Sequence, residues 1–110
     1  MNIKQAIVVN LKANMPSGRF LAQACHSSEL AFEHPGVVEL KKRFPTEMSP
    51  CTKIVLRGWG DNHLVELHEK ALALGIPCAL WGEDGFKTAL AVGPASAQEI
   101  DKITGGMVLY

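Results

Sequence analysis

The chain has 110 residues, of which 47% are hydrophobic and 20% charged, values typical of one ordered globular domain with a core of two or three layers. Eleven basic side chains balance eleven acidic ones, so no overall positive field attracts a nucleic acid, and any such contact depends on a local basic patch. No apolar run approaches the roughly 20 residues of a membrane span, and the first residues do not have the pattern of a signal peptide. We therefore expect a cytoplasmic protein.

The first third of the chain predicts a strand, a loop and a helix. Residues 3–9 are dense in β-branched side chains, as in a central strand that is buried on both faces. Asparagines and a proline mark residues 10–16 as a loop. A first helix is predicted from about residue 18 to residue 33, with Ser17 as its N-cap and Pro35 ending it.

A second, short helix is predicted over residues 37–44, and its basic run at residues 41–43 is typical of a solvated helix end. Residues 52–57 then form a second strand, and Gly58 ends it. His34, which precedes a proline, is expected to act as a helix cap.

Strand 52–57 begins a β-α-β unit. A helix is predicted over residues 63–74, with Asp61 as its N-cap and Gly75 closing it. Residues 77–81 follow as another strand. The two strands should therefore run parallel, joined by a right-handed crossover.

The last part of the chain adds a hairpin and a helix. Residues 82–86 form a tight acidic turn before a last strand at residues 88–92, so these strands pair antiparallel and the sheet is mixed. Ser96 opens a final helix over residues 97–103 through a capping box, and the apolar tail 107–110 is expected to pack down. The order predicts an α/β fold, a three-layer α/β/α sandwich with a small mixed sheet of about four strands.

Metal and disulfide chemistry is not expected. The three cysteines, Cys25, Cys51 and Cys78, are widely spaced and odd in number, which fits neither a disulfide framework nor a Cys-x-x-Cys metal site, so we expect reduced and mostly buried thiols. His63 and His68 lie five residues apart, not four as in a helical metal pair, and are expected to be exposed. We predict neither a metal nor a cofactor.

The first helix carries the strongest candidate site. At about 100° per residue, Arg19, Gln23 and His26 lie within roughly 60° of one another and form one polar row. An anion there would meet Arg19, the unpaired N–H groups and the positive end of the helix dipole, and Gly18 would permit close approach. The alternative interpretation is an ordinary solvated helix face.

The opposite, apolar side of this helix is expected to face the core; it comprises Phe20, Leu21, Ala24, Cys25, Ala31 and Phe32. Cys25 is therefore predicted to be a core residue and not a thiol nucleophile beside His26.

Basic and aromatic residues elsewhere are candidates for binding a substrate. A basic patch would form if the segments carrying Lys12, Arg19, Lys53 and Arg57 converge. The two tryptophans, Trp59 and Trp81, are more typical of a core or a dimer interface than of stacking on a base; Trp81, beside the acidic turn, is the better ligand candidate.

These residues resemble a known family. Residues 18–27, G-R-F-L-A-Q-A-C-H-S, resemble the G-K-x-x-A-Q-x-x-H-A signature of the type II (archaeal and eukaryotic-type) peptidyl-tRNA hydrolases. Residues 88–94, T-A-L-A-V-G-P, and residues 100–110, I-D-K-I-T-G-G-M-V-L-Y, are similar to that family's T-x-L-A-I-G-P and I-D-K-V-T-G-x-L-x-L-Y segments. The resemblance covers nearly the whole chain. It implies that residues 1–110 form one domain, often a homodimer, that hydrolyses the ester joining a peptide to the 3′ end of tRNA without a metal.

The resemblance also implies roles for individual residues. Gln23, His26 and Thr88 stand at the family's glutamine, histidine and threonine positions. Arg19 stands where the family has lysine; a guanidinium can hold a phosphate or an oxyanion but cannot relay a proton. The family's Asp-Ala-Gly-x-Thr loop is shortened to G-E-D-G-F-K, so either Glu83 or Asp84 could replace its aspartate, and its threonine has no counterpart.

Ester hydrolysis needs an activated water and a stabilised oxyanion. The hypothesis is that His26 or a carboxylate of the pair Glu83 and Asp84 takes a proton from water, while Arg19, Gln23 and Thr88 hold the carbonyl oxygen or the neighbouring phosphate. The expected substrate-binding residues are Lys12, Gly18, Lys53 and Trp81.

Two alternatives remain open at this point. The chain could be a non-catalytic relative that binds a partner or a small phosphate-bearing ligand, because a fold does not fix a function. It could also be an esterase or amidase for another aminoacyl or peptidyl substrate. A positive potential around Arg19, Lys12 and Lys53 would favour tRNA, whereas a neutral, closed pocket would favour a small ligand.

Overall fold

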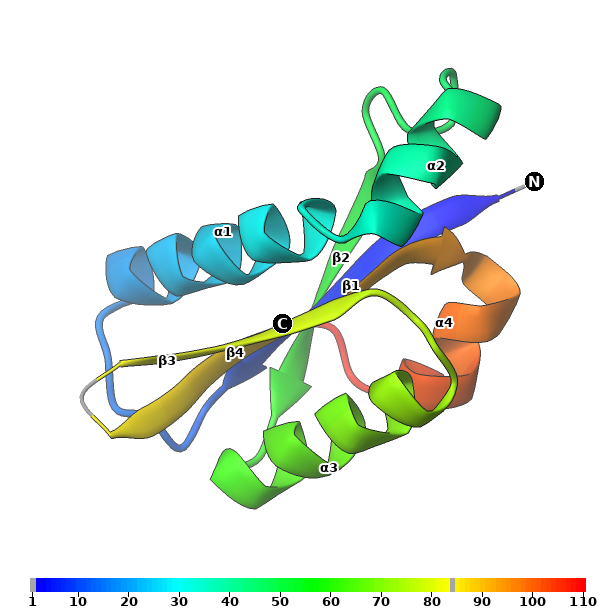
Figure 1. Cartoon of the computed structure of the whole chain (residues 1–110). Coiled ribbons are helices and arrows are strands. Elements are labelled where there is room, and N and C mark those ends of the chain that lie inside the picture. The colour runs from blue at the N-terminus through cyan, green and yellow to red at the C-terminus, as the bar shows by residue number, and fades with distance from the viewer. Residues whose placement is uncertain (1, 84) are drawn as a thin grey trace.

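The computed structural model describes residues 2–83 and 85–110, so Asp84, one of the two predicted carboxylates, lies outside the described residues. The helices and strands follow one another along the chain in the predicted order (Figure 1). The elements are β1 (Ile3–Asn10), α1 (Ser17–Phe32), α2 (Pro35–Arg43), β2 (Thr52–Gly58), α3 (Asp61–Ala73), β3 (Cys78–Glu83), β4 (Phe86–Ser96) and α4 (Ala97–Thr104).

The strands form one sheet in the order β2-β1-β4-β3. Strand β1 pairs parallel with β2 and antiparallel with β4, and β3 pairs antiparallel with β4. The predicted mixed sheet, the central first strand and the final hairpin are therefore confirmed. Strands β2 and β3 run in the same direction, as predicted, with β1 and β4 lying between them.

Helix α1 covers one face of the sheet, and α3 and α4 cover the other (Figure 1). Strand β1 supplies both cores: Ala6 and Val8 pack with α3 and α4, whereas Ile7 and Val9 pack with Phe20 of α1. Because both faces of β1 are buried, its residues 6–9 are a continuous apolar run and do not alternate between apolar and polar residues. The three-layer α/β/α sandwich is confirmed.

Strand β4 is longer than the predicted strand at residues 88–92 at both ends: it begins at Phe86, within the predicted turn, and it continues through a glycine to Ser96. Its pairing with β1 shifts register between Lys4 and Ala6. Gly93 adopts a φ of +97°, and a Cβ there would lie 2.8 Å from the Lys4 carbonyl oxygen. The irregularity therefore needs glycine, and the strand resumes beyond it.

Two predicted N-caps are wrong by one residue. Pro16, not Ser17, caps α1, and Gly60, not Asp61, caps α3; neither cap uses a side-chain hydrogen bond. Asp61 Oδ1 instead accepts hydrogen bonds from Asn10 Nδ2 at 3.0 Å and from a backbone N–H at the start of β4 at 3.2 Å. The carboxylate thus joins three elements, which sequence spacing alone does not reveal.

Other helix ends follow the predictions. Ser96 Oγ accepts a hydrogen bond from the Glu99 N–H, and His34 Nδ1 accepts one from the Gly36 N–H, so both residues cap helices. Gly75 has a φ of +69° and closes α3 with the paired backbone bonds of a Schellman motif.

The tail at residues 107–110 packs through its backbone rather than through most of its side chains. The Arg57 N–H donates to the Val108 carbonyl oxygen at 2.9 Å, and the Tyr110 N–H donates to the Val55 carbonyl oxygen at 2.8 Å. The side chains of Val108, Leu109 and Tyr110 stay 51–64% exposed. The tail therefore lines the outer edge of β2.

The two histidines of α3 are half-buried, not exposed as predicted. His63 Nδ1 accepts a hydrogen bond from the Trp59 N–H at 3.0 Å. Burial lowers the pKa of His68; nearby Glu69 opposes this shift and Lys87 adds to it. Neither ring belongs to a group of three or more metal-ligating side chains within the described part of the chain. None of the helices described is both long and apolar enough to cross a membrane.

Candidate functional site

Helix α1 is rotated relative to the predicted orientation. Gln23, expected to face water, is only 3% exposed, whereas Leu21 is 64% exposed and Cys25 is also exposed. The prediction of Cys25 as a core residue is therefore wrong. Helix α1 packs on β4, β3 and β1 and leaves the neighbouring face of β2 open, so the flank of the helix that carries Leu21 and Cys25 borders an apolar groove.

The rotation brings α1 against the end of β3. Glu83, the last residue of β3, accepts a hydrogen bond from Arg19 at Oε1, 2.7 Å away, and another from Gln23 Nε2 at Oε2, 2.5 Å away. The Thr88 hydroxyl donates to Gln23 Oε1 at 2.7 Å and lies 3.1 Å from the Trp81 carbonyl oxygen. Arg19, Gln23, Glu83 and Thr88 form one network, called the Glu83 network below.

The Glu83 network runs from the core to the surface. Thr88 and Gln23 are 1% and 3% exposed, whereas the side chains of Arg19 and Glu83 are 50% and 39% exposed. Because Thr88 occupies the carbonyl oxygen of the Gln23 amide, the amide nitrogen faces Glu83. The carboxylate is thus oriented from the buried side and remains accessible from the other.

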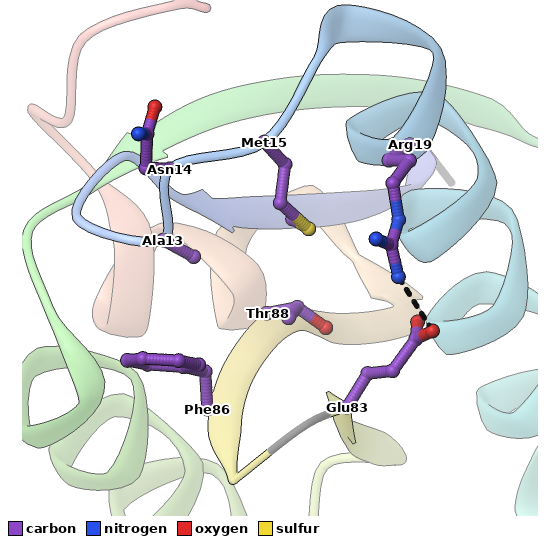
Figure 2. A pocket seen from close by; sticks show the side chains of 7 residues that line it. All are labelled: Ala13, Asn14, Met15, Arg19, Glu83, Phe86 and Thr88. Carbon is purple, nitrogen blue, oxygen red and sulfur yellow. Dashed lines mark hydrogen bonds and ion pairs between the residues drawn. The ribbon is translucent and has the colours of Figure 1, made fainter.

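The exposed side of the network lines a pocket of about 130 Å³ (Figure 2). Arg19, Glu83 and Thr88 form a polar wall, and a less polar wall faces them across the pocket. The lining residues are Ala13, Asn14, Met15, Arg19, Glu83, Phe86 and Thr88. A water occupies about 30 Å³, so the pocket has room for a few waters or for a small reacting group.

The loop before α1 and the start of β4 supply the pocket residues that the sequence analysis missed, namely Ala13, Asn14, Met15 and Phe86. Their only sequence signal is position: the loop follows the carboxyl end of β1, where α/β sheets place ligands. Phe86 is apolar yet 54% exposed, and no spacing rule singles it out.

The sequence predicts only a loop residue at Asn10, but Asn10 is the last residue of β1 and is buried next to the pocket, where it joins several segments. Its Nδ2 donates to Asp61 Oδ1 and to the Lys87 carbonyl oxygen, and its Oδ1 accepts from the N–H groups of Lys12 and Gly60. It therefore fixes the segments that follow β1 and β2 against the start of β4.

His26 lies apart from the Glu83 network. Its ring is exposed and contacts the Trp81 ring, with 4.9 Å between the ring centroids and 36° between the planes. Trp81 precedes Glu83 by two residues on β3 and is half-buried. The three side chains of the predicted polar row therefore do not share one set of contacts. Arg19 and Gln23 contact Glu83, whereas His26 contacts Trp81. Trp59, the other tryptophan, is 56% exposed.

Gly18 and Lys12 lie near the pocket without lining it. A Cβ on Gly18 would meet nothing within 4 Å, so nothing among the described residues requires glycine there. Lys12 is exposed, and its Cγ would lie 3.7 Å from a Cβ on Gly60. Lys12 therefore stands beside the loop between β2 and α3.

Lys53 lies away from the pocket. Its ammonium group stands over the Phe32 ring, 4.5 Å from the ring centroid. In the sheet it pairs with Gln5, whereas the Glu83 network lies at the other end of β1, near Asn10. The structure therefore does not bring Lys53 together with Arg19.

Comparisons with known proteins place the chain among relatives of one kind. A family model described as "Peptidyl-tRNA hydrolase PTH2" matches residues 3–110. The "Peptidyl-tRNA hydrolase" of Haloquadratum walsbyi is 35% identical over 115 residues, which are 98% of this chain and 100% of that protein. The "Peptidyl-tRNA hydrolase" of Pyrobaculum aerophilum is 32% identical over 119 residues, 100% of this chain and 99% of that protein. The "Probable peptidyl-tRNA hydrolase 2" of Dictyostelium discoideum is 33% identical over 115 residues, which are 97% of this chain and 54% of that protein.

Proposed function

Because the chain belongs to the peptidyl-tRNA hydrolase PTH2 family, we infer that it hydrolyses the ester bond between a peptide and the 3′ end of tRNA and so recycles the tRNA. The observation that carries this function is the carboxylate of Glu83, held by Arg19 and Gln23 at the wall of a pocket. The three relatives named above are all described as hydrolases. No comparison favours a non-catalytic relative.

Glu83 is the general base of this proposal. Each of its carboxylate oxygens accepts one hydrogen bond from the protein, and a carboxylate oxygen has a second lone pair that can bind a water in the pocket. The carboxylate takes a proton from that water as the water oxygen attacks the ester carbonyl carbon. Gln23 and Thr88 act as positioning residues, because both are buried and together orient the carboxylate.

Arg19 supplies positive charge to the same wall. As the water attacks, charge develops on the carbonyl oxygen, and a guanidinium at the pocket stabilises it or holds the adjoining phosphate. When the tetrahedral intermediate collapses, the bond to the tRNA 3′ oxygen breaks. The protonated Glu83 returns its proton to that oxygen, so the products are a peptide carboxylic acid and a free 3′ hydroxyl.

The test is turnover by the purified protein. We expect it to release peptide from an N-acetylated peptidyl-tRNA well above the buffer rate, and to act much more slowly on a peptide ethyl ester, which has no tRNA. Rapid hydrolysis of the ethyl ester with no preference for tRNA would favour the esterase alternative. No release from peptidyl-tRNA would contradict the proposed function.

We also propose a local basic patch for the tRNA, at the end of the sheet where β1 and β2 finish and β4 begins. Three features support it: Arg57 pairs with Val9 near the end of β1, Lys12 follows β1, and Lys87 lies near the start of β4. Of these cations only Arg19 lines the pocket among the described residues, and the others would extend a local positive charge beyond it on a chain with no net charge.

The patch predicts a salt-dependent effect of Lys12. A Lys12→Ala variant should raise KM severalfold with little change in kcat, and should make the slope of log(kcat/KM) against log[salt] shallower by about 0.7–0.9. Lys53→Ala is the matched control, because Lys53 lies at the other end of the sheet. Equal effects of the two variants would contradict the patch.

We further propose that residues 1–110 form one domain and that the protein acts in the cytoplasm, where ribosomes form peptidyl-tRNA. We also propose that it forms a homodimer. The apolar groove between α1 and β2, lined in part by Leu21, Phe32 and Val55, supports the dimer because it leaves apolar surface in water. Analytical ultracentrifugation that finds only the mass of one chain at micromolar concentration would contradict the dimer.

A further inference from the structure

Strand β3 leaves one edge of the sheet open beside the Glu83 network. β3 stands last in the strand order and pairs with β4 on one side, and no other described segment pairs with it (Figure 1). The opposite edge of the sheet, on β2, is covered by the backbone of Val108 and Tyr110. The fold therefore protects one edge and exposes the other.

Over residues 78–82 the open edge lacks the charges and prolines that usually discourage strand pairing, and the charged Glu83 stands at the end of the strand. Proteins protect exposed edges with charged side chains, prolines or short strands. Residues 78–82, C-A-L-W-G, include neither a charge nor a proline, and β3 extends over six residues. Helices α1 and α3 pack on its two faces, so only the hydrogen-bonding edge is left for a ligand.

The register shows which backbone groups face that edge. The Gly93 N–H donates to the Pro77 carbonyl oxygen at 2.7 Å, so residue 77 turns its carbonyl group toward β4. These groups alternate along an antiparallel strand, so Ala79 and Trp81 also face β4. Cys78 and Leu80 consequently direct their N–H and C=O groups outward.

We propose that the open edge of β3 binds the peptide of peptidyl-tRNA as an added, parallel β-strand. This inference rests on the proposed function. The ester carbonyl must lie at Glu83, where β3 ends, so the C-terminus of the peptide points the same way as the strand. The peptide then runs back from the pocket along residues 83 to 78.

Main-chain pairing suits a substrate whose sequence varies. Peptides on tRNA share a backbone but not side chains, and strand addition recognises the backbone. Side chains of the added strand would point alternately toward α1 and α3, and those on the α1 side would pass the rings of His26 and Trp81. The exposed His26 then borders the peptide and does not act on the ester.

The distances predict a dependence on peptide length. At about 3.3 Å per residue, Leu80 lies roughly 10 Å and Cys78 roughly 17 Å along the strand from Glu83. An N-acetyl-aminoacyl-tRNA cannot reach either residue, whereas a hexapeptide reaches both. We expect kcat/KM to rise about tenfold or more from the first substrate to the hexapeptidyl-tRNA and then to level off, since each hydrogen bond contributes roughly twofold to tenfold.

Two variants of Leu80 distinguish the contribution of its backbone N–H to peptide binding from the contribution of its side chain. Leu80→Pro removes the outward N–H, a change that edge strands tolerate, whereas Leu80→Ala removes the side chain and keeps the N–H. The measured quantity is the ratio of kcat/KM for the hexapeptidyl substrate to that for the N-acetyl-aminoacyl substrate on the same variant. We expect Leu80→Pro to lower this ratio about threefold to tenfold, and Leu80→Ala to preserve it.

A substrate series tests the same edge without changing the protein. N-methylation of single amides in the hexapeptide should lower kcat/KM at alternate positions only, because alternate amides of a strand face its neighbour. Equal kcat/KM for short and long peptides, or N-methyl effects without alternation, would overturn the added strand while leaving the hydrolase intact. Failure to hydrolyse any of these substrates would overturn both proposals.

Discussion

A Glu83→Gln variant is expected to lower kcat for peptidyl-tRNA by about a hundredfold to ten-thousandfold, an increase in the barrier of about 3 to 5 kcal/mol. Glutamine preserves the size of the side chain and an oxygen that can accept the Arg19 hydrogen bond, but it cannot take a proton from water. KM should change little, because the amide still occupies the pocket wall. Single-turnover rates at saturating enzyme measure the chemical step directly.

His26→Ala is the matched control for Glu83→Gln. The resemblance makes His26 an alternative general base, but its ring contacts Trp81 and not the Glu83 network. We expect His26→Ala to keep kcat within about fivefold of the unchanged protein. A greater loss in His26→Ala than in Glu83→Gln would identify the imidazole as the base and contradict the role of Glu83.

An Arg19→Met variant is expected to lower kcat/KM by about a hundredfold to a thousandfold. Methionine is comparable in length but lacks both the charge at the pocket and the hydrogen bond to Glu83 Oε1. The melting temperature should shift by no more than a few degrees, because ion pairs in contact with solvent contribute little to stability and both side chains are partly exposed. A normal kcat/KM in a folded Arg19→Met variant would remove the guanidinium from the mechanism.

Arg19→Lys tests what the arginine contributes beyond charge. A lysine ammonium restores the positive charge but not the planar set of donors, so a loss within about tenfold would indicate that charge is the main requirement. A loss as large as in Arg19→Met would indicate that the guanidinium geometry itself is needed.

Most of the fold could be predicted from local patterns. The apolar run in β1, the hairpin before β4 and the Ser96 cap depend on neighbours in the chain, and all three are confirmed. The predictions that failed depend on contacts between distant segments. Asp61 accepts tertiary hydrogen bonds instead of capping α3, and β4 continues through Gly93 because that glycine meets the backbone of Lys4.

The candidate site, like the fold, could be predicted only in part from the sequence. Motif positions predicted Arg19, Gln23 and Thr88 as site residues, and the shortened acidic turn left Glu83 and Asp84 as alternatives. A helical wheel could not show that Gln23 is buried, because the wheel gives relative angles and not the direction of the sheet. Phe86 and Met15 were missed because only the fold brings them to one pocket.

By itself, the sequence of this protein determined the kinds of element, their order and the family, because hydrophobic period, turn residues and motifs act over a few neighbouring positions. Only the tertiary structure decided that Glu83 meets Arg19 and Gln23 while His26 meets Trp81. The physical reason is that α1 can pack on the sheet at more than one rotation and offset, and contacts with residues some 60 positions away select one of them.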